Sequence, residues 1–337
     1  MAPQPQHTLL DIRNLHLRLP SPKGELHLLN DISLTLERGR TLGIVGESGA
    51  GKSMLIRAIM GLASRKARIS GEIRFDGDTI TGMPEARRRR LLGARVGVVF
   101  QNPTASLNAF ERVGPQVSEA ARVHRGISAE EARELAISLL ERVGIPDAAS
   151  CHDRYPHEFS GGMKQRIMIA SALAIEPDLL IADEATTALD VTVQKEILDL
   201  LQILQAETGM GMIQVTHNLG VVAGRTDEVA VMYGGRLVET GPTRAVFEAP
   251  GHQYTQRLIA AVPSLQAPID QELVSIPGQP PDRLIGIRAC PFAPRCAAAT
   301  PLCSETMPVL APAGDDGHKA ACHHPPRVPA QTLEGAR

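Results

Sequence analysis

An eight-residue loop constrains this chain more than any other feature, because it sets three glycines, a lysine and a serine in a fixed order. It follows a short apolar run at residues 41–45 and precedes an apolar helical stretch at residues 54–60. Glycines let backbone N–H groups turn toward phosphate oxygens, and the following helix presents its positive end to them. In this pattern Lys52 reaches the β and γ oxygens of a nucleoside triphosphate, and the Ser53 hydroxyl ligates Mg²⁺. A glycine turn before an arbitrary helix accounts less well for the strand–loop–helix order. This phosphate loop consists of Gly46, Glu47, Ser48, Gly49, Ala50, Gly51, Lys52 and Ser53.

Two carboxylates follow a second apolar strand, at residues 179–182. Asp183 is placed to bind the Mg²⁺ shell, and Glu184 to polarise a water for in-line attack on the γ-phosphate. Alone, such a pair is more often a cap or a solvated surface pair. Here it lies about 130 residues after the phosphate loop, as the far strand of one nucleotide fold does. Together the two motifs predict an NTPase.

A third motif, Ser160-Gly161-Gly162, opens a helix that runs to about residue 175. Its glycines and the helix N-terminus form a second anion-binding surface. A flexible Gly-Gly turn would account for these residues alone, but one chain does not need two phosphate cradles for one nucleotide. Two chains facing each other head-to-tail do, so the motif predicts a dimer of nucleotide domains.

The chain alternates short buried strands with helical patterns such as residues 193–205, which predicts a parallel sheet covered by helices on both faces. Residues 9–19 and 28–36 alternate apolar with polar and predict a half-exposed antiparallel sheet. The fold class is therefore α/β. The remaining strand candidates are residues 96–100, 211–215 and 228–232. The expected organisation is a nucleotide domain at 8–250 with a helical subdomain at about 105–165, an irregular extension at 251–325 and a flexible tail at 326–337.

Bulk properties argue against several other classes. The net charge of −2 and the 3% aromatic content give no case for nucleic acid as a partner. The arginines at 87–90 are therefore read as a solvated helix face. The start resembles no signal peptide, and no apolar run is long enough to span a bilayer. We expect the five cysteines to stay reduced in the cytoplasm.

The order of the motifs resembles that of ABC-transporter ATPases, over roughly residues 8–325. The resemblance adds the loop Ala188-Leu189-Asp190 to the nucleotide site, and it implies a P-loop NTPase core that binds ATP and Mg²⁺. Gln101 resembles the Q-loop glutamine that touches Mg²⁺ and signals to the membrane domains. His217 resembles the switch histidine at the γ-phosphate, although a lone histidine is usually structural.

Within that family the sequence resembles those of the dipeptide, oligopeptide and nickel importers. The resemblance implies ATP-driven uptake of peptides or a related solute by a peripheral subunit on the cytoplasmic face of the inner membrane. Its implied partners are two integral membrane permeases, a second identical or related ATPase, and an extracytoplasmic solute-binding protein. A soluble ABC ATPase of DNA repair or translation, or an importer of nickel or glutathione, is the alternative. The stretches that carry the resemblance are residues 101–108, 155–159, 188–194, 252–256 and 276–281.

Four cysteines lie in the extension with intervening spacings of 5, 6 and 18 residues. Four thiols in a segment of little apolar content suggest a cross-linking centre. Structural zinc usually uses closer pairs, whereas iron–sulfur clusters tolerate such spacings. The family resemblance likewise implies a [4Fe–4S] cluster. Zinc, a ligand role for His323 or His324, and four plain reduced thiols remain open, and Cys151 is expected to be packed in the core. The four are Cys290, Cys296, Cys303 and Cys322.

Two positions depart from the family pattern. Leu19 stands where ABC ATPases stack adenine on an aromatic ring, which would remove about 1–3 kcal/mol of stacking. Ala185 stands where the family commonly has proline after the glutamate, with an expected effect on loop stiffness only.

Overall fold

The computed structural model describes residues 7–22, 24–186, 189–262, 275–281, 288–314 and 317–326. The chain divides into two compact units. The first unit contains Met1–Leu9, Leu36–Arg40 and Gly82–Val215, and the second contains Leu10–Thr35, Thr41–Thr81 and Thr216–Arg337. Ala188 and the predicted tail from residue 327 onward lie outside the described residues.

Three parallel strands form the sheet of the first unit, with β7 between the other two. The first four residues of β7 are fully buried, as expected for a short apolar strand covered on both faces. Pairing sets Val96 opposite Leu179, and Leu179 opposite Gly211. All three strands agree with the predicted segments to within one residue. They are β6 (Val96–Val99), β7 (Leu179–Asp183) and β8 (Gly211–Thr216).

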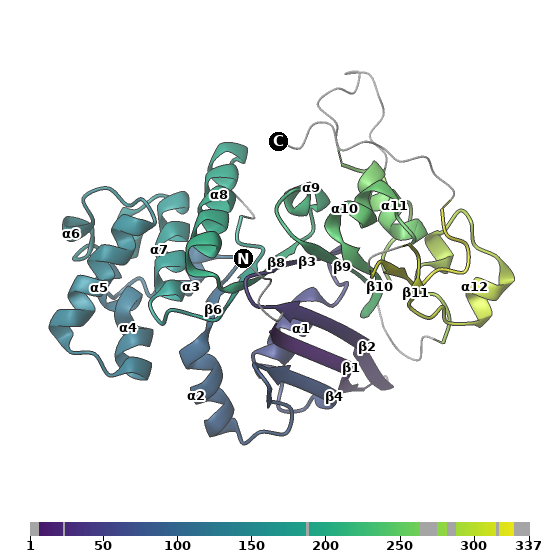
Figure 1. Cartoon of the computed structure of the whole chain (residues 1–337), viewed down its shortest axis with the longest axis horizontal. Coiled ribbons are helices and arrows are strands. Elements are labelled where there is room, and N and C mark those ends of the chain that lie inside the picture. The colour runs from purple at the N-terminus through teal and green to yellow at the C-terminus, as the bar shows by residue number, and fades with distance from the viewer. Residues whose placement is uncertain are drawn as a thin grey trace. The chain divides into compact units, whose positions relative to one another are not determined.

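Helices α4, α5, α6 and α7 pack together in the first unit, as the teal part of Figure 1 shows. Their shared core holds Leu140, Ile167 and Ile169, each fully buried, together with Cys151, which is 3% exposed as predicted. The helices and one 3₁₀ turn of this unit are α2 (Glu85–Arg95), α3 (Pro103–Ser106), α4 (Val113–Arg125), α5 (Ala129–Arg142), α6 (Ala148–Cys151), η1 (Pro156–Glu158), α7 (Gly161–Leu173) and α8 (Val191–Thr208).

A capping box begins α5. The Ser128 hydroxyl accepts the N–H of Glu131 at 3.2 Å, and the Glu131 carboxylate accepts the N–H of Ser128 at 2.7 Å. A cap of this kind contributes about 0.5–2 kcal/mol. On α2 the predicted solvated run of arginines is mostly exposed.

The strands of the second unit lie in two sheets. In the first sheet the order is β2-β1-β4-β5, and β4 runs antiparallel to β1. In the second sheet β3 pairs in parallel with β9, and β10, β12 and β11 continue it with antiparallel pairs. The strands are β1 (Thr8–Ser21), β2 (Gly24–Glu37), β3 (Thr41–Val45), β4 (Arg68–Phe75), β5 (Asp78–Thr79), β9 (Glu228–Tyr233), β10 (Arg236–Pro242), β11 (Ala311–Pro312) and β12 (Lys319–Ala320).

The described part of the extension holds more regular structure than its sequence suggested. It contributes β11 and β12 to the second sheet, although each strand has only two residues. Among the described residues, no helix is both long and apolar enough to cross a membrane. The helices of this unit are α1 (Lys52–Ile59), α9 (Leu219–Val222), α10 (Thr243–Glu248), α11 (Gln253–Ala260), η2 (Ala293–Arg295) and α12 (Pro301–Glu305).

A fully buried carboxylate, Glu239 on β10, ties the extension to this sheet. It accepts hydrogen bonds from the N–H groups of Gly251 at 2.5 Å and His252 at 2.9 Å. His318, which is 2% exposed, approaches the same carboxylate through Nε2 at 2.7 Å. These partners compensate the cost of burying Glu239, and they join β10 to the start of α11 and to the β11–β12 hairpin.

We expect Ile169→Ala in α7 to lower the free energy of unfolding by about 2–5 kcal/mol, because the fully buried side chain leaves a cavity. Ile203→Ala in α8 is the matched control. Its side chain is 55% exposed, so its effect should stay within about 0.5 kcal/mol. Urea unfolding of both variants measures the difference, and equal losses would contradict the assignment of Ile169 to the core.

Candidate nucleotide-binding site

The phosphate loop lies between β3 and α1, where the sequence predicted it. Gly46 has φ 154°, and a Cβ on it would lie 2.3 Å from the carbonyl oxygen of Met232. Only glycine fits this backbone position. Lys52 begins α1 and is 5% exposed, and its Nζ donates to the carbonyl oxygens of Gly46 at 2.7 Å and Glu47 at 3.1 Å. The ammonium group is thus held over the loop, beside the positive end of the helix.

Glu184, at the end of β7, has φ +48°, a conformation that non-glycine residues rarely adopt and that is common at functional sites. Its N–H donates to the carbonyl of Val215 at 3.0 Å, which sets the turn after β7. Its carboxylate accepts a hydrogen bond from Gln101 Nε2 at 2.8 Å. The first unit therefore brings together two residues that the sequence placed in separate motifs. Asp183, which precedes Glu184 in the chain, is half-buried.

Ser160 caps α7, with its hydroxyl accepting the N–H of Met163 at 3.3 Å. A Cβ on Gly162 would lie 2.8 Å from the side chain of Val193, so glycine there permits α7 to pack closely against the start of α8. Asp190 caps α8 by accepting the N–H of Val193 at 3.0 Å. This capping role of Asp190 was not anticipated from the sequence, although the position before a long helical pattern signals it.

The predicted residues divide between the two units. His217 belongs to the second unit, as the phosphate loop does, and its exposed side chain directly follows β8. The first unit carries Gln101, Asp183, Glu184, Asp190 and the motif at residues 160–162.

Sequence reasoning missed two side chains that contact the phosphate loop. The Tyr254 hydroxyl accepts the N–H of Glu47 at 2.9 Å, and Arg295 makes an ion pair with the Glu47 carboxylate at 2.7 Å. Arg295 lies within the cysteine motif, and Tyr254 lies in residues 252–256, which carry the family resemblance. Neither pattern indicates a contact with the phosphate loop.

The four cysteines of the extension line one small cavity, of about 10 Å³. Burial is the main cause that raises the pKa of Cys290, Cys296 and Cys322, which favours neutral thiols. The described residues contain no group of three or more His, Cys, Asp or Glu side chains arranged to hold a metal ion. The iron–sulfur prediction therefore gains no support from ligand geometry.

His252, His323 and His324 border the same cavity, and the last two are the histidines that the sequence offered as ligands. His324 Nε2 lies 2.8 Å from the Thr300 hydroxyl, and His323 Nε2 lies 3.1 Å from the Thr306 carbonyl. The Nε2 atom of each of these two histidines thus already has a partner in the extension.

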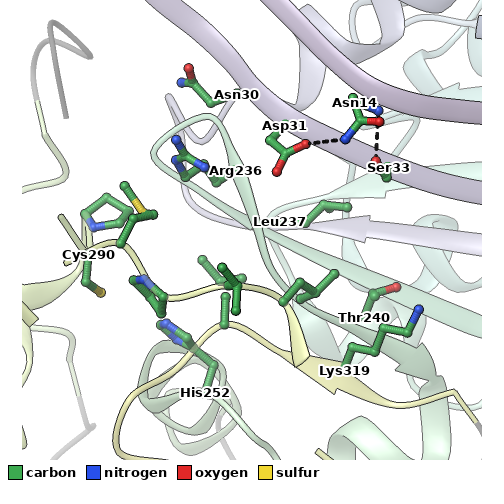
Figure 2. A pocket seen from close by; sticks show the side chains of 17 residues that line it. Asn14, Asn30, Asp31, Ser33, Arg236, Leu237, Thr240, His252, Cys290 and Lys319 are labelled. Carbon is green, nitrogen blue, oxygen red and sulfur yellow. Dashed lines mark hydrogen bonds between the residues drawn. The ribbon is translucent and has the colours of Figure 1, made fainter. Parts of the chain in front are cut away.

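Another cavity, of about 410 Å³, also has Cys290 and His252 in its lining, which Figure 2 shows. Burial lowers the pKa of Arg236 in its wall, while the nearby Asp31 carboxylate opposes that shift. No residue of the phosphate loop lines this cavity, so it is not the predicted nucleotide site.

The sequence matches the family model for ABC transporters over residues 29–187, and the model for the C-terminal region of oligopeptide/dipeptide transporters over residues 238–303. It is 45% identical to the oligopeptide transport ATP-binding protein OppD of Salmonella typhimurium, over 96% of both chains. The chain belongs to the ABC transporter family. OppD of Escherichia coli is also 45% identical, over 92% of this chain and 91% of that protein.

Solved ABC structures agree with the fold. The ATP-binding cassette MJ0796, a dimer in a post-hydrolysis state with ADP and Pi, superposes with a TM-score of 0.63 at 26% identity, covering 70% of this chain and 99% of that one. The structure of cbiO1 from Clostridium perfringens, part of an ABC transporter complex, gives 0.62 at 33% identity, covering 72% and 91%. The predicted α/β ABC ATPase fold is confirmed, and the chain is an ABC-type ATPase.

The half-buried Leu19 on β1 gives a test of adenine binding. We expect Leu19→Tyr to tighten ATP but not inorganic triphosphate, because only ATP has a base to stack on the ring. A gain of up to about 1–3 kcal/mol is the usual scale for such stacking. Calorimetric titration with both ligands measures it, and equal effects on the two would show that another side chain already covers the base.

Proposed function

We propose that this chain hydrolyses ATP to power the import of oligopeptides. The observation that carries the proposal is the 45% identity to an oligopeptide transport ATP-binding protein along nearly the whole of both chains. The match of residues 238–303 to the C-terminal region of oligopeptide/dipeptide transporters supports the same substrate class. A soluble ATPase of DNA repair or translation is not favoured by either match, and nickel or glutathione import is the remaining alternative.

The chemistry is phosphoryl transfer to water. The N–H groups of the phosphate loop and the Lys52 ammonium bind the phosphate oxygens, and a bound Mg²⁺ would neutralise part of their negative charge. The hydroxyl of Ser53, the carboxylate of Asp183 and the amide oxygen of Gln101 are the oxygen ligands that Mg²⁺ prefers.

Glu184 orients the attacking water and accepts its proton while the γ-phosphoryl group leaves ADP. The Gln101 amide, 2.8 Å from the Glu184 carboxylate, is placed to orient it and to sense the state of the site. His217 has the role of contacting the γ-phosphate.

The remaining assignments complete an importer. Residues 8–250 form the nucleotide domain and residues 251–325 the extension. A second ATPase subunit, identical or related, faces this one so that Ser160, Gly161 and Gly162 of each close the other's nucleotide site, with Asp190 beside them. Two permeases bind the pair at the cytoplasmic face of the inner membrane, and an extracytoplasmic binding protein delivers the peptide. The helix N-termini at the starts of α7 and α1, each a positive end suited to phosphate, support this arrangement.

Glu184→Gln should keep ATP affinity, lower turnover at least about a hundredfold and stop uptake of a labelled oligopeptide by the assembled transporter. The amide keeps the size and one hydrogen-bond acceptor but cannot take the proton. Glu176→Gln is the matched control, since Glu176 is an exposed residue of the same unit that pairs with Arg125.

ATPase assays and uptake into vesicles measure both properties. Turnover near that of the control would reject Glu184 as the base. Uptake of nickel or glutathione, with no peptide uptake, would reject the substrate.

We further propose that Cys290, Cys296, Cys303 and Cys322 hold one [4Fe–4S] cluster. Their common cavity supports a shared centre, and four thiolates suit such a cluster. The described side chains do not form a ready metal-binding arrangement, so binding would require the thiols to ionise and close in. A cluster there would cross-link segments of the chain and would take no part in ATP hydrolysis.

Protein purified without oxygen should then be brown and carry about four iron and four sulfide per chain. Any single Cys→Ser change among the four should remove the colour, whereas Cys151→Ser should not, because Cys151 does not line their cavity. Metal analysis and absorbance check this. If the analysis finds one zinc per chain, the centre is a zinc site and not a cluster. If the protein carries no metal and its extension is still folded, both kinds of centre are excluded.

A further inference from the structure

Arg295 of the extension is saturated with partners around the phosphate loop. A guanidinium group has five N–H donors, and Arg295 makes five hydrogen bonds. Two form a fork on the Glu47 carboxylate, at 2.7 and 3.2 Å. The others go to the Tyr233 hydroxyl and to the carbonyls of Ile276 and Pro277, at 2.8 to 3.2 Å. The Arg295 side chain is only 6% exposed, so its position is fixed by these contacts.

Glu47 is held a second time, through its backbone. Its N–H donates to the hydroxyl of Tyr254, which is fully buried against Tyr233 and Phe292 at centroid distances of 4.6 and 5.3 Å. Phe292 lies three residues before Arg295, so one segment of the extension supplies both the aromatic support and the cation. Tyr254 and Arg295 of the extension thus contact the same loop residue, Glu47.

The chemistry of a phosphate loop makes this contact unusual. The loop pattern leaves position 47 open, and a carboxylate there carries negative charge beside the place where a triphosphate binds. Like charges this close disfavour each other, and Glu47 is 23% exposed, so solvent screens it only in part. A bidentate arginine compensates that charge and holds both carboxylate oxygens.

We propose that Arg295 is a positioning residue for ATP binding: it holds Glu47 and neutralises its charge, so that the C-terminal extension sets the affinity of the phosphate loop for triphosphate. This inference rests on the proposed role of the loop in binding ATP. It makes the extension a determinant of nucleotide affinity in addition to whatever its cysteines bind.

The test compares Arg295→Met, Glu47→Gln and the double variant in the assembled transporter. Arg295→Met leaves Glu47 uncompensated, so the KM for ATP should rise roughly tenfold, a typical size for coupling between distinct sites, with kcat nearly unchanged. Glu47→Gln removes the repulsive charge and should lower the KM for ATP. The double variant should return close to the wild type, and added salt should reduce the effect of Arg295→Met.

Opposite directions for the two single variants separate charge compensation from a purely structural tie. If both raise KM alike, or if kcat falls instead of KM rising, the proposal is wrong. Arg244→Met is the matched control, because Arg244 is an exposed residue of the same unit that pairs with Glu248 at 2.7 Å. Thermal unfolding of each variant shows whether a change in KM reflects loss of structure, and rescue by the second substitution is expected only if the charge is the cause.

Lys52→Ala distinguishes this inference from the function on which it rests. If Lys52→Ala abolishes ATP binding while Arg295→Met changes nothing, only the role of Arg295 fails. If Lys52→Ala leaves ATP binding intact, the loop is not the nucleotide site and both fail.

Discussion

The arrangement of the second unit around its phosphate loop depends on the close contact of this loop with the end of β9 and with the turn that follows β9. A side chain on Gly46 would overlap the carbonyl oxygen of Met232, and the N–H of Gly235 donates to the carbonyl of Ala50 at 3.0 Å. The loop backbone is thus hydrogen-bonded to the β9–β10 turn. Because β3 and β9 pair in parallel, with Val45 opposite Val231, strand, loop and turn form one rigid arrangement. The start of α1 and the direction of its N–H groups follow from it.

Elements with a strong local signal were predicted well from the sequence. The five residues at 41–45 are all buried, and a short apolar run before a glycine loop is typical of a buried strand that leads into a phosphate site. The strands at 96–99 and 179–183 are short apolar runs of the same kind. By contrast β11 and β12 have two residues each, so no periodicity can reveal them. Their pairing depends on β10 and on Glu239, a buried carboxylate whose partners lie 12 to 79 residues away.

The candidate site shows the same division. Spacing and residue type placed Lys52 and Glu184, since phosphate and water chemistry demand them. Spacing and residue type could not show that Gln101 contacts Glu184, because 83 residues separate the two. The contact exists only after β6 and β7 pair. The Arg295–Glu47 pair spans 248 residues and joins two separate motifs, so only the folded chain reveals it.

The extension has a source of stability that its composition did not suggest. Few large apolar residues predicted a segment that needs a cross-link in place of a core. Phe292 is in fact 1% exposed and packs with Tyr233 and Tyr254 in the core of the second unit, with Cys290 and Cys296 against the same cluster. The extension thus shares a core that it could not build alone, and a fully buried aromatic side chain contributes about 1.5–3 kcal/mol. Burial of Phe292 also brings η2, and with it Arg295, to the loop. The same packing that orders the extension therefore delivers the charge that Glu47 requires, and in this way a short segment of low apolar content can act on a nucleotide loop formed far away in the sequence.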